Sequence, residues 1–185
     1  MTLRAIDVEA ELTAVGRAIE ALANRAFGRR QIMETNPSAN LFRHSSVSRA
    51  EHLLQRLTAA AHRLTRSSDD DDRWISYDED HEALPRHGAW TAESLYVLGR
   101  MANILRAIAR RAGPLPSQSR FLGLLTPALE ARTRRDRREA AMVLADMLEE
   151  KGLLDEADHL RADRYSDSAI QWVGWALGYR RSTAR

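Results

Sequence analysis

The chain of 185 residues carries 28 lysine and arginine residues against 26 aspartate and glutamate residues, which gives a formal net charge of only +2 at pH 7. Its composition, with 44% apolar and 29% charged residues, is typical of a globular protein. The absence of cysteine excludes disulfides, thiolate nucleophiles and cysteine-bound zinc. Arginines interrupt every long apolar stretch, and Met1 to Glu11 lack the pattern of a secretory signal, so we expect a cytoplasmic protein that contacts no membrane.

The first part of the chain predicts two helices. Apolar residues recur three and four positions apart over 7–29, which indicates an amphipathic helix. The segment 31–43 has no clear period, so we expect a loop or a short helical turn there. Ser48, with Glu51 three residues later, has the pattern of a capping box and predicts the start of a second helix. These helices should pair as an antiparallel hairpin over residues 1–66.

Residues 67–90 follow as a strongly acidic segment. Between Asp69 and Glu82 there are eight carboxylates and one arginine. Like charges packed this closely favour an extended, solvated chain, and Pro85 interrupts the segment further. We therefore expect an acidic ordered loop that is attached to the core by its apolar residues, namely Trp74, Ile75, Tyr77, Leu84 and Trp90.

A long helix should follow this segment. Thr91 can cap its start, and the Gly113-Pro114 pair is a typical helix end. Its apolar residues extend over two faces, which predicts a central helix that contacts several neighbours. The segment 121–125 then predicts a short helix, and Thr126-Pro127 the start of another.

Three more helices are predicted toward the C-terminus. Asp136 with Glu139 has the pattern of a capping box, and the helix that it begins should close at Gly152. A short helix is expected over 155–163, and Ser168 should open the last one. No stretch of useful length alternates like a strand. We therefore predict an all-α fold, a single irregular bundle of six to eight helices, in which 91–185 forms one compact domain with 1–66.

One helical hairpin resembles a known family. Ala145 to Gly152 read Ala-Asp-Met-Leu-Glu-Glu-Lys-Gly, and Ala157 to Arg161 read Ala-Asp-His-Leu-Arg. This resembles the repeat-companion domain, whose pattern is roughly Ala-Asp-Trp-Leu-Glu-Glu-x-Gly followed by Ala-Glu-Phe-Ile-Arg. Met147 stands where that family has tryptophan. The resemblance covers about residues 139–163 and implies a helical hairpin without a defined activity.

Positive charge is concentrated between Arg100 and Arg138, where there are ten arginines and only two carboxylates, Glu130 and Asp136. Arginine suits bidentate phosphate contacts, although a GC-rich coding sequence produces the same bias. Free N–H groups at a helix start, together with arginines, would make a phosphate cradle. The predicted nucleic-acid-binding residues are Arg106, Arg110, Arg111, Arg132, Arg134, Arg135, Arg137 and Arg138. The alternative is that these arginines pair internally with the acidic segment.

Two features favour a protein partner instead. The acidic run could mimic a phosphate backbone toward a basic protein, and the aromatic side chains of the last helix could form a partner surface. The alternative for the aromatic residues is that they belong to the core. The candidate protein-binding residues are Asp69, Asp70, Asp71, Asp72, Trp172, Trp175 and Tyr179.

No catalytic, metal or cofactor site is predicted. The sequence lacks a nucleophile elbow, a glycine-rich phosphate loop and an ordered set of Ser, His and Asp. The segment Asp78 to Glu82 contains His81 among carboxylates, but its spacing matches no metal motif. We therefore predict a non-enzymatic accessory or adaptor protein that contacts the backbone of nucleic acid, alone or in a nucleoprotein complex. The alternative is a protein-binding module or inhibitor.

Overall fold

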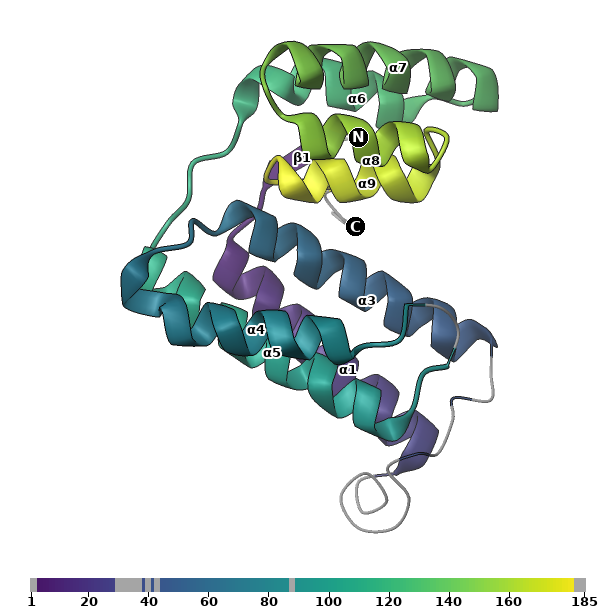
Figure 1. The fold of residues 1–185 in the computed structure, drawn as a ribbon. Coiled ribbons are helices and arrows are strands. Elements are labelled where there is room, and N and C mark those ends of the chain that lie inside the picture. The colour runs from purple at the N-terminus through teal and green to yellow at the C-terminus, as the bar shows by residue number, and fades with distance from the viewer. Residues whose placement is uncertain (1–2, 29–37, 39–40, 42–43, 87–88, 182–185) are drawn as a thin grey trace. The chain divides into compact units, whose positions relative to one another are not determined.

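The computed structural model describes residues 3–28, 38, 41, 44–86 and 89–181, which Figure 1 shows as a coloured ribbon. These described residues form eight α-helices and two short strands, which confirms the predicted all-α class and number of helices. None of these helices is long and apolar enough to cross a membrane.

The chain divides into two compact units. We call Asp7–Leu115 the N-terminal unit, and Met1–Ile6 with Pro116–Arg185 the C-terminal unit. This division differs from the predicted segments, because the boundary falls inside 91–185. The physical reason is the end of the long helix, where Gly113 adopts a left-handed φ of 69° and prolines follow that cannot continue a helix.

The described part of the N-terminal unit contains α1 (Val8–Phe27), α3 (His44–Arg63), a 3-10 turn η1 (Ser68–Asp70), α4 (Asp71–Ala83) and α5 (Ala92–Ala112). α1 and α3 contact each other and run in opposite directions, as predicted (Figure 1). α5 packs against α1, α3 and α4, which confirms its predicted central position. Its most deeply buried side chains are those of Leu95, Leu98, Met101, Leu105 and Ile108.

The ends of α1 and α5 follow from local chemistry. The side chain of Asp7 accepts a hydrogen bond from the N–H of Ala10 and so caps α1. Thr91 caps α5 as predicted, and it exchanges reciprocal hydrogen bonds with Ser94 in a capping box. The predicted box at Ser48 is wrong, because α3 already begins at His44. Apart from positions 38 and 41, the predicted loop over 31–43 lies outside the described residues.

The acidic loop predicted over 67–90 is wrong, because α4 occupies its middle. Trp74 and Tyr77 are three residues apart and buried on one face of this helix. Asp71 and Asp72 lie in its first turn, where the helix dipole favours negative charge. The aspartates therefore start a helix instead of keeping the chain extended.

The C-terminal unit contains a 3-10 turn η2 (Ser119–Phe121), α6 (Leu122–Glu130), α7 (Arg134–Glu150), α8 (Leu154–Ala162) and α9 (Asp167–Ala176). α6 contacts α7 and α9, and α8 also contacts both of these helices, so the four helices surround one core. The strands β1 (Leu3–Ala5) and β2 (Tyr179–Arg181) pair antiparallel, with Arg4 opposite Arg180. These strands were not predicted, because three residues are too few to show an alternating pattern.

Three helix starts in the C-terminal unit differ from the predictions. The last helix, α9, begins at Asp167 with Ser166 as its cap, so the predicted start at Ser168 is wrong. α6 is one continuous helix that contains Pro127, so the predicted restart at that proline is wrong. α7 begins at Arg134, because Thr133 provides the cap that was predicted at Asp136. The hairpin of α7 and α8 forms around Gly152, which has a φ of 79°. Membership of the repeat-companion family stays a prediction.

Candidate nucleic-acid interface

The C-terminal unit contains a cleft of about 1290 Å³, and half of the residues that line it are arginines. The start of α7 contributes four of them, α8 contributes one, and the turn between α8 and α9 contributes another. We call it the basic cleft. Its arginines are Arg134, Arg135, Arg137, Arg138, Arg161 and Arg164, and the carboxylates among its lining residues are those of Glu139, Asp163 and Asp167.

Two helices begin at the basic cleft. The hydroxyl of Thr133 caps α7 by accepting a hydrogen bond from the N–H of Asp136 at 3.1 Å. The hydroxyl of Ser166 caps α9 by accepting from the N–H of Ala169, also at 3.1 Å. A helix N-terminus carries a partial positive charge and favours an anion nearby. The backbone therefore adds to the positive potential of the arginine side chains.

The turn between α8 and α9 has an unusual backbone. Arg164 and Tyr165 adopt left-handed φ values of 50° and 60°, a conformation that costs a non-glycine residue roughly 1–2 kcal/mol. Backbone hydrogen bonds hold this turn, since the N–H of Tyr165 donates to the carbonyl of Leu160 at 2.8 Å. The turn places both side chains in the lining of the basic cleft.

Three of the cleft arginines have carboxylate partners. Nε of Arg135 donates to Glu139 at 2.9 Å within α7, and Arg161 pairs with Asp146 and Glu149. Nε of Arg137 lies 2.9 Å from Oδ1 of Asp167, although the N–H does not point at that oxygen. The ion pairs of Arg161 and Arg137 connect α7 with α8 and α9.

The other three cleft arginines have no carboxylate partner among the described residues, and all three are exposed. They are Arg134, Arg138 and Arg164. The carboxylate of Asp163, which also lines the cleft, already accepts hydrogen bonds from the hydroxyls of Ser166 and Ser168. The basic cleft therefore keeps three arginines without an ion pair among the described residues, and the carboxylate of Asp163 keeps one negative charge in the same lining.

The remaining predicted arginines lie elsewhere. Arg132 is exposed but does not line the cleft. Arg106, Arg110 and Arg111 belong to α5, in the N-terminal unit, where Arg110 pairs with Glu9. Arg111 follows the predicted alternative of pairing within the protein. Its guanidinium lies 3.2 Å from the carboxylate of Asp70.

The acidic run also contains both buried and exposed carboxylates. Asp70 is buried and pairs with Arg73 as well as with Arg111. Farther along α4, Asp80 is buried and accepts two hydrogen bonds from Arg100 of α5. The carboxylates of Asp69, Asp71 and Asp72 are exposed. Part of the predicted acidic surface therefore holds α4 against α5.

The aromatic residues near the C-terminus are mostly in the core. Trp172 and Tyr179 are only 6% and 5% exposed, and Trp175 is half-buried. The ring of Trp172 lies 4.2 Å from that of His159, centroid to centroid, and burial lowers the pKa of His159 despite the opposing charge of Asp163. The structure therefore supports the alternative that Trp172 and Tyr179 belong to the core.

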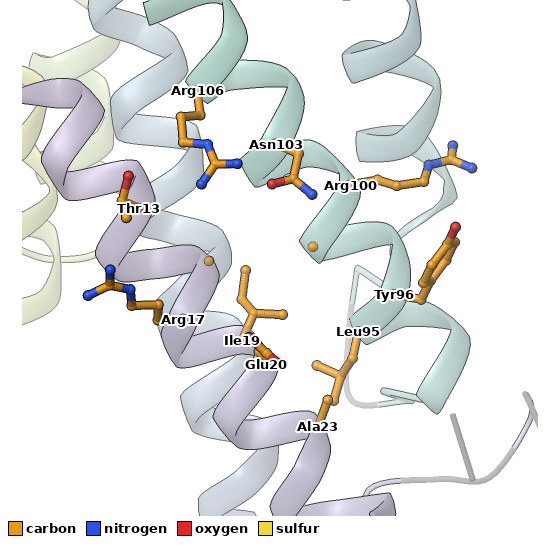
Figure 2. Close-up of a pocket in the computed structure, with 12 residues that line it drawn as sticks. Thr13, Arg17, Ile19, Glu20, Ala23, Leu95, Tyr96, Arg100, Asn103 and Arg106 are labelled. Atoms are coloured by element: carbon orange, nitrogen blue, oxygen red, sulfur yellow. The ribbon is translucent and has the colours of Figure 1, made fainter. Parts of the chain in front are cut away.

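A second groove of about 470 Å³ lies in the N-terminal unit between α1 and α5 (Figure 2). Arg106 extends over this groove from α5, and Thr13 lies opposite on α1. The described residues contain no group of three or more His, Asp or Glu side chains placed to hold a metal ion. Comparison of the chain with protein families, curated proteins and solved structures finds no match.

Sequence reasoning found the arginines of α7 but missed Arg161, Arg164 and Tyr165. The α7 arginines are adjacent in the sequence, so charge counting detects them. The missed residues reach the cleft only because α8 packs against α7 and then turns into α9. No local pattern in the sequence predicts that packing.

Proposed function

We propose that this protein is a non-enzymatic accessory or adaptor protein whose basic cleft binds the sugar–phosphate backbone of nucleic acid. The observation that carries the proposal is the convergence of six arginines and two helix N-termini on one cleft. Three of these arginines have no carboxylate partner among the described residues. Arginine forks and helix N-termini are both common partners of phosphate.

The size and chemistry of the cleft favour a polymer over a small anion. Its volume of about 1290 Å³ exceeds the 300–1,000 Å³ or so of ordinary small-molecule pockets. Its cationic side chains come from α7, α8 and the turn before α9, so they would contact several phosphates at once. Contacts of this kind position a protein on nucleic acid without reading its bases. We therefore propose binding that is largely independent of sequence.

The test is fluorescence anisotropy with labelled single-stranded and duplex DNA and RNA, at roughly 50 and 200 mM salt, because phosphate-driven binding weakens steeply over that range. The test variant is Arg134→Glu with Arg138→Glu, since both side chains are exposed and have no carboxylate partner among the described residues. Arg137 is left unchanged because it pairs with Asp167 across two helices. The matched control is Arg25→Glu with Arg49→Glu, two exposed arginines of the N-terminal unit.

We expect micromolar binding at low salt that the cleft variant loses and the control variant retains. Both variants change the net charge by the same amount, so a general effect of charge would weaken both equally. Equal weakening, or no binding by the unaltered protein at low salt, would refute the proposal. The search would then turn to the protein partner that remains the alternative prediction.

A further inference from the structure

We infer that the groove between α1 and α5 binds a small aromatic monoanion, such as an aromatic carboxylate. This site lies wholly in the N-terminal unit, so the inference does not depend on the basic cleft. Its volume of about 470 Å³ is within the range of pockets that enclose small organic ligands. Figure 2 shows the groove with the side chains that line it.

Two glycines line the groove. Gly16 of α1 and Gly99 of α5 both line it, and both lie in the interior of a helix. A Cβ atom at Gly16 would meet no atom within 4 Å, and one at Gly99 would make an ordinary contact of 3.9 Å with Ile19. Neither glycine has a positive φ.

Glycine inside a helix is unfavourable relative to alanine, because its backbone loses more conformational freedom when the chain folds. Neither the packing nor the backbone geometry of the N-terminal unit requires glycine at these two positions. A requirement for space above the helix backbones explains them. A flat ring laid against Gly16 and Gly99 would use that space.

The groove has an apolar part and a cationic part. Ile19, Ala23 and Leu95 are buried residues that line it and provide a floor for a ring. Arg106 is half-buried and has no ion-pair partner among the described residues. It extends over the groove near Asn103 (Figure 2). A guanidinium and an amide beside an apolar floor suit a ligand with a carboxylate on an aromatic ring.

The remaining charges limit the ligand to one negative charge. Arg17 also lines the groove, but so does the carboxylate of Glu20, which would repel a second anionic group. Arg100 lines the groove too, and its guanidinium is already engaged by Asp80 of α4. The positive charge available to a ligand therefore comes from Arg106 and Arg17, offset in part by Glu20.

The experiment is an amide ¹⁵N–¹H NMR titration of the full chain with three probes. The first probe is 1-naphthoate, which has both ring and charge. The second is 1-naphthalenemethanol, which has the ring alone, and the third is acetate, which has the charge alone. We expect 1-naphthoate to shift the amides of α1 and α5 around Gly16 and Gly99, and to bind at least tenfold more tightly than either of the others.

Two variants test the assignment of the groove. Gly16→Leu fills the space above α1, and Arg106→Gln removes the cation, so each should weaken 1-naphthoate binding at least tenfold. The matched control is Gly123→Leu, because Gly123 is also a helical glycine with no atom near its Cβ position, but belongs to the C-terminal unit. Helical circular dichroism and the urea midpoint establish that each variant is folded.

The inference is overturned if 1-naphthoate shifts no amide of α1 or α5, or if folded Gly16→Leu or Arg106→Gln binds it as tightly as the unaltered protein. Equal affinity for 1-naphthalenemethanol would also overturn it, because the anion would then be irrelevant. Loss of binding in the control variant alone would place the ligand in the C-terminal unit and reject this groove.

Discussion

Neutralising the three cleft arginines without carboxylate partners should remove most of the salt dependence of nucleic-acid binding. The variant combines Arg134→Gln, Arg138→Gln and Arg164→Gln. Glutamine keeps a polar side chain at each exposed position, so the change removes charge without placing an apolar residue at the surface. The paired cleft arginines remain, and so do the caps of both helices.

The magnitude follows from the number of charges. Each phosphate that a protein neutralises contributes about −0.9 to the slope of log K against log salt for duplex DNA, and about −0.7 for a single strand. Three engaged arginines therefore predict slopes of roughly −2.7 and −2.1. A rise from about 50 to about 200 mM salt would then weaken binding about 40-fold for duplex and about 20-fold for a single strand. If the paired arginines also exchanged their carboxylates for phosphates, the duplex slope would approach roughly −5.

The assay is anisotropy at five or more salt concentrations, with the same labelled strands for each variant. The triple variant should give a slope near zero and weak binding throughout. The control is Arg25→Gln with Arg49→Gln and Arg86→Gln, which removes three exposed arginines from the N-terminal unit. A slope that stays unchanged in the cleft variant, or that falls equally in the control, would refute the reasoning.

Three further predictions concern stability and are measured by urea unfolding. Burial raises the pKa of Tyr77 to about 12, above its unfolded value of about 10. As the pH rises between these values, the phenol loses its proton in the unfolded chain first, so the free energy of unfolding should fall by roughly 3 kcal/mol. An equal fall in Tyr77→Phe would contradict the assignment to Tyr77. Thr133→Ala removes the cap of α7 and should cost roughly 1 kcal/mol, whereas no loss would mean that water replaces the cap. Leu105→Ala, at a fully buried site, should cost about 2–5 kcal/mol; a loss under about 1 kcal/mol would indicate that the core collapses around the change.

The parts of the fold that depend on local pattern were predictable. The apolar spacing along α5, with Leu98 and Leu105 among its buried residues, indicated both the helix and its central position. Thr91 and Gly113 marked its ends, because a cap and a left-handed glycine act over only a few residues. Patterns of this kind need no knowledge of the neighbouring helices.

α4 was missed because its stability comes from its neighbour. Counting charges in its sequence predicts repulsion and an extended chain. The structure places Asp70 and Asp80 against Arg111 and Arg100 of α5, so two of the carboxylates are neutralised by tertiary contacts. Ion pairs between residues 20 or more positions apart do not appear in a local window. The position of Trp74 fits the spacing of apolar residues in a helix, but the prediction followed the density of negative charge and gave a loop.

The residues of the candidate site also divide into those that the sequence predicts and those that only tertiary packing brings together. Charge counting identified the arginines of α7, while Arg161 and Arg164 joined them only through the packing of α8 and α9. The same counting also selected Arg110 and Arg111 of α5, which are paired with carboxylates in the N-terminal unit. A run of basic residues thus indicates a possible site, and only the positions of the carboxylates show which arginines stay available.

The helical geometry of α7 explains why some of its arginines stay unpaired. Successive residues point about 100° apart around a helix, so one neighbouring element can reach only some of them. Arg137 faces Asp167 at the start of α9, and Arg135 reaches Glu139 one turn along. Arg134 and Arg138 are four positions apart and share a face, where two like charges repel by a few tenths of a kcal/mol. Arg164 lines the same cleft and adds a third charge. A phosphate backbone in the cleft would relieve this repulsion, which is the physical reason for proposing that these three side chains contact nucleic acid.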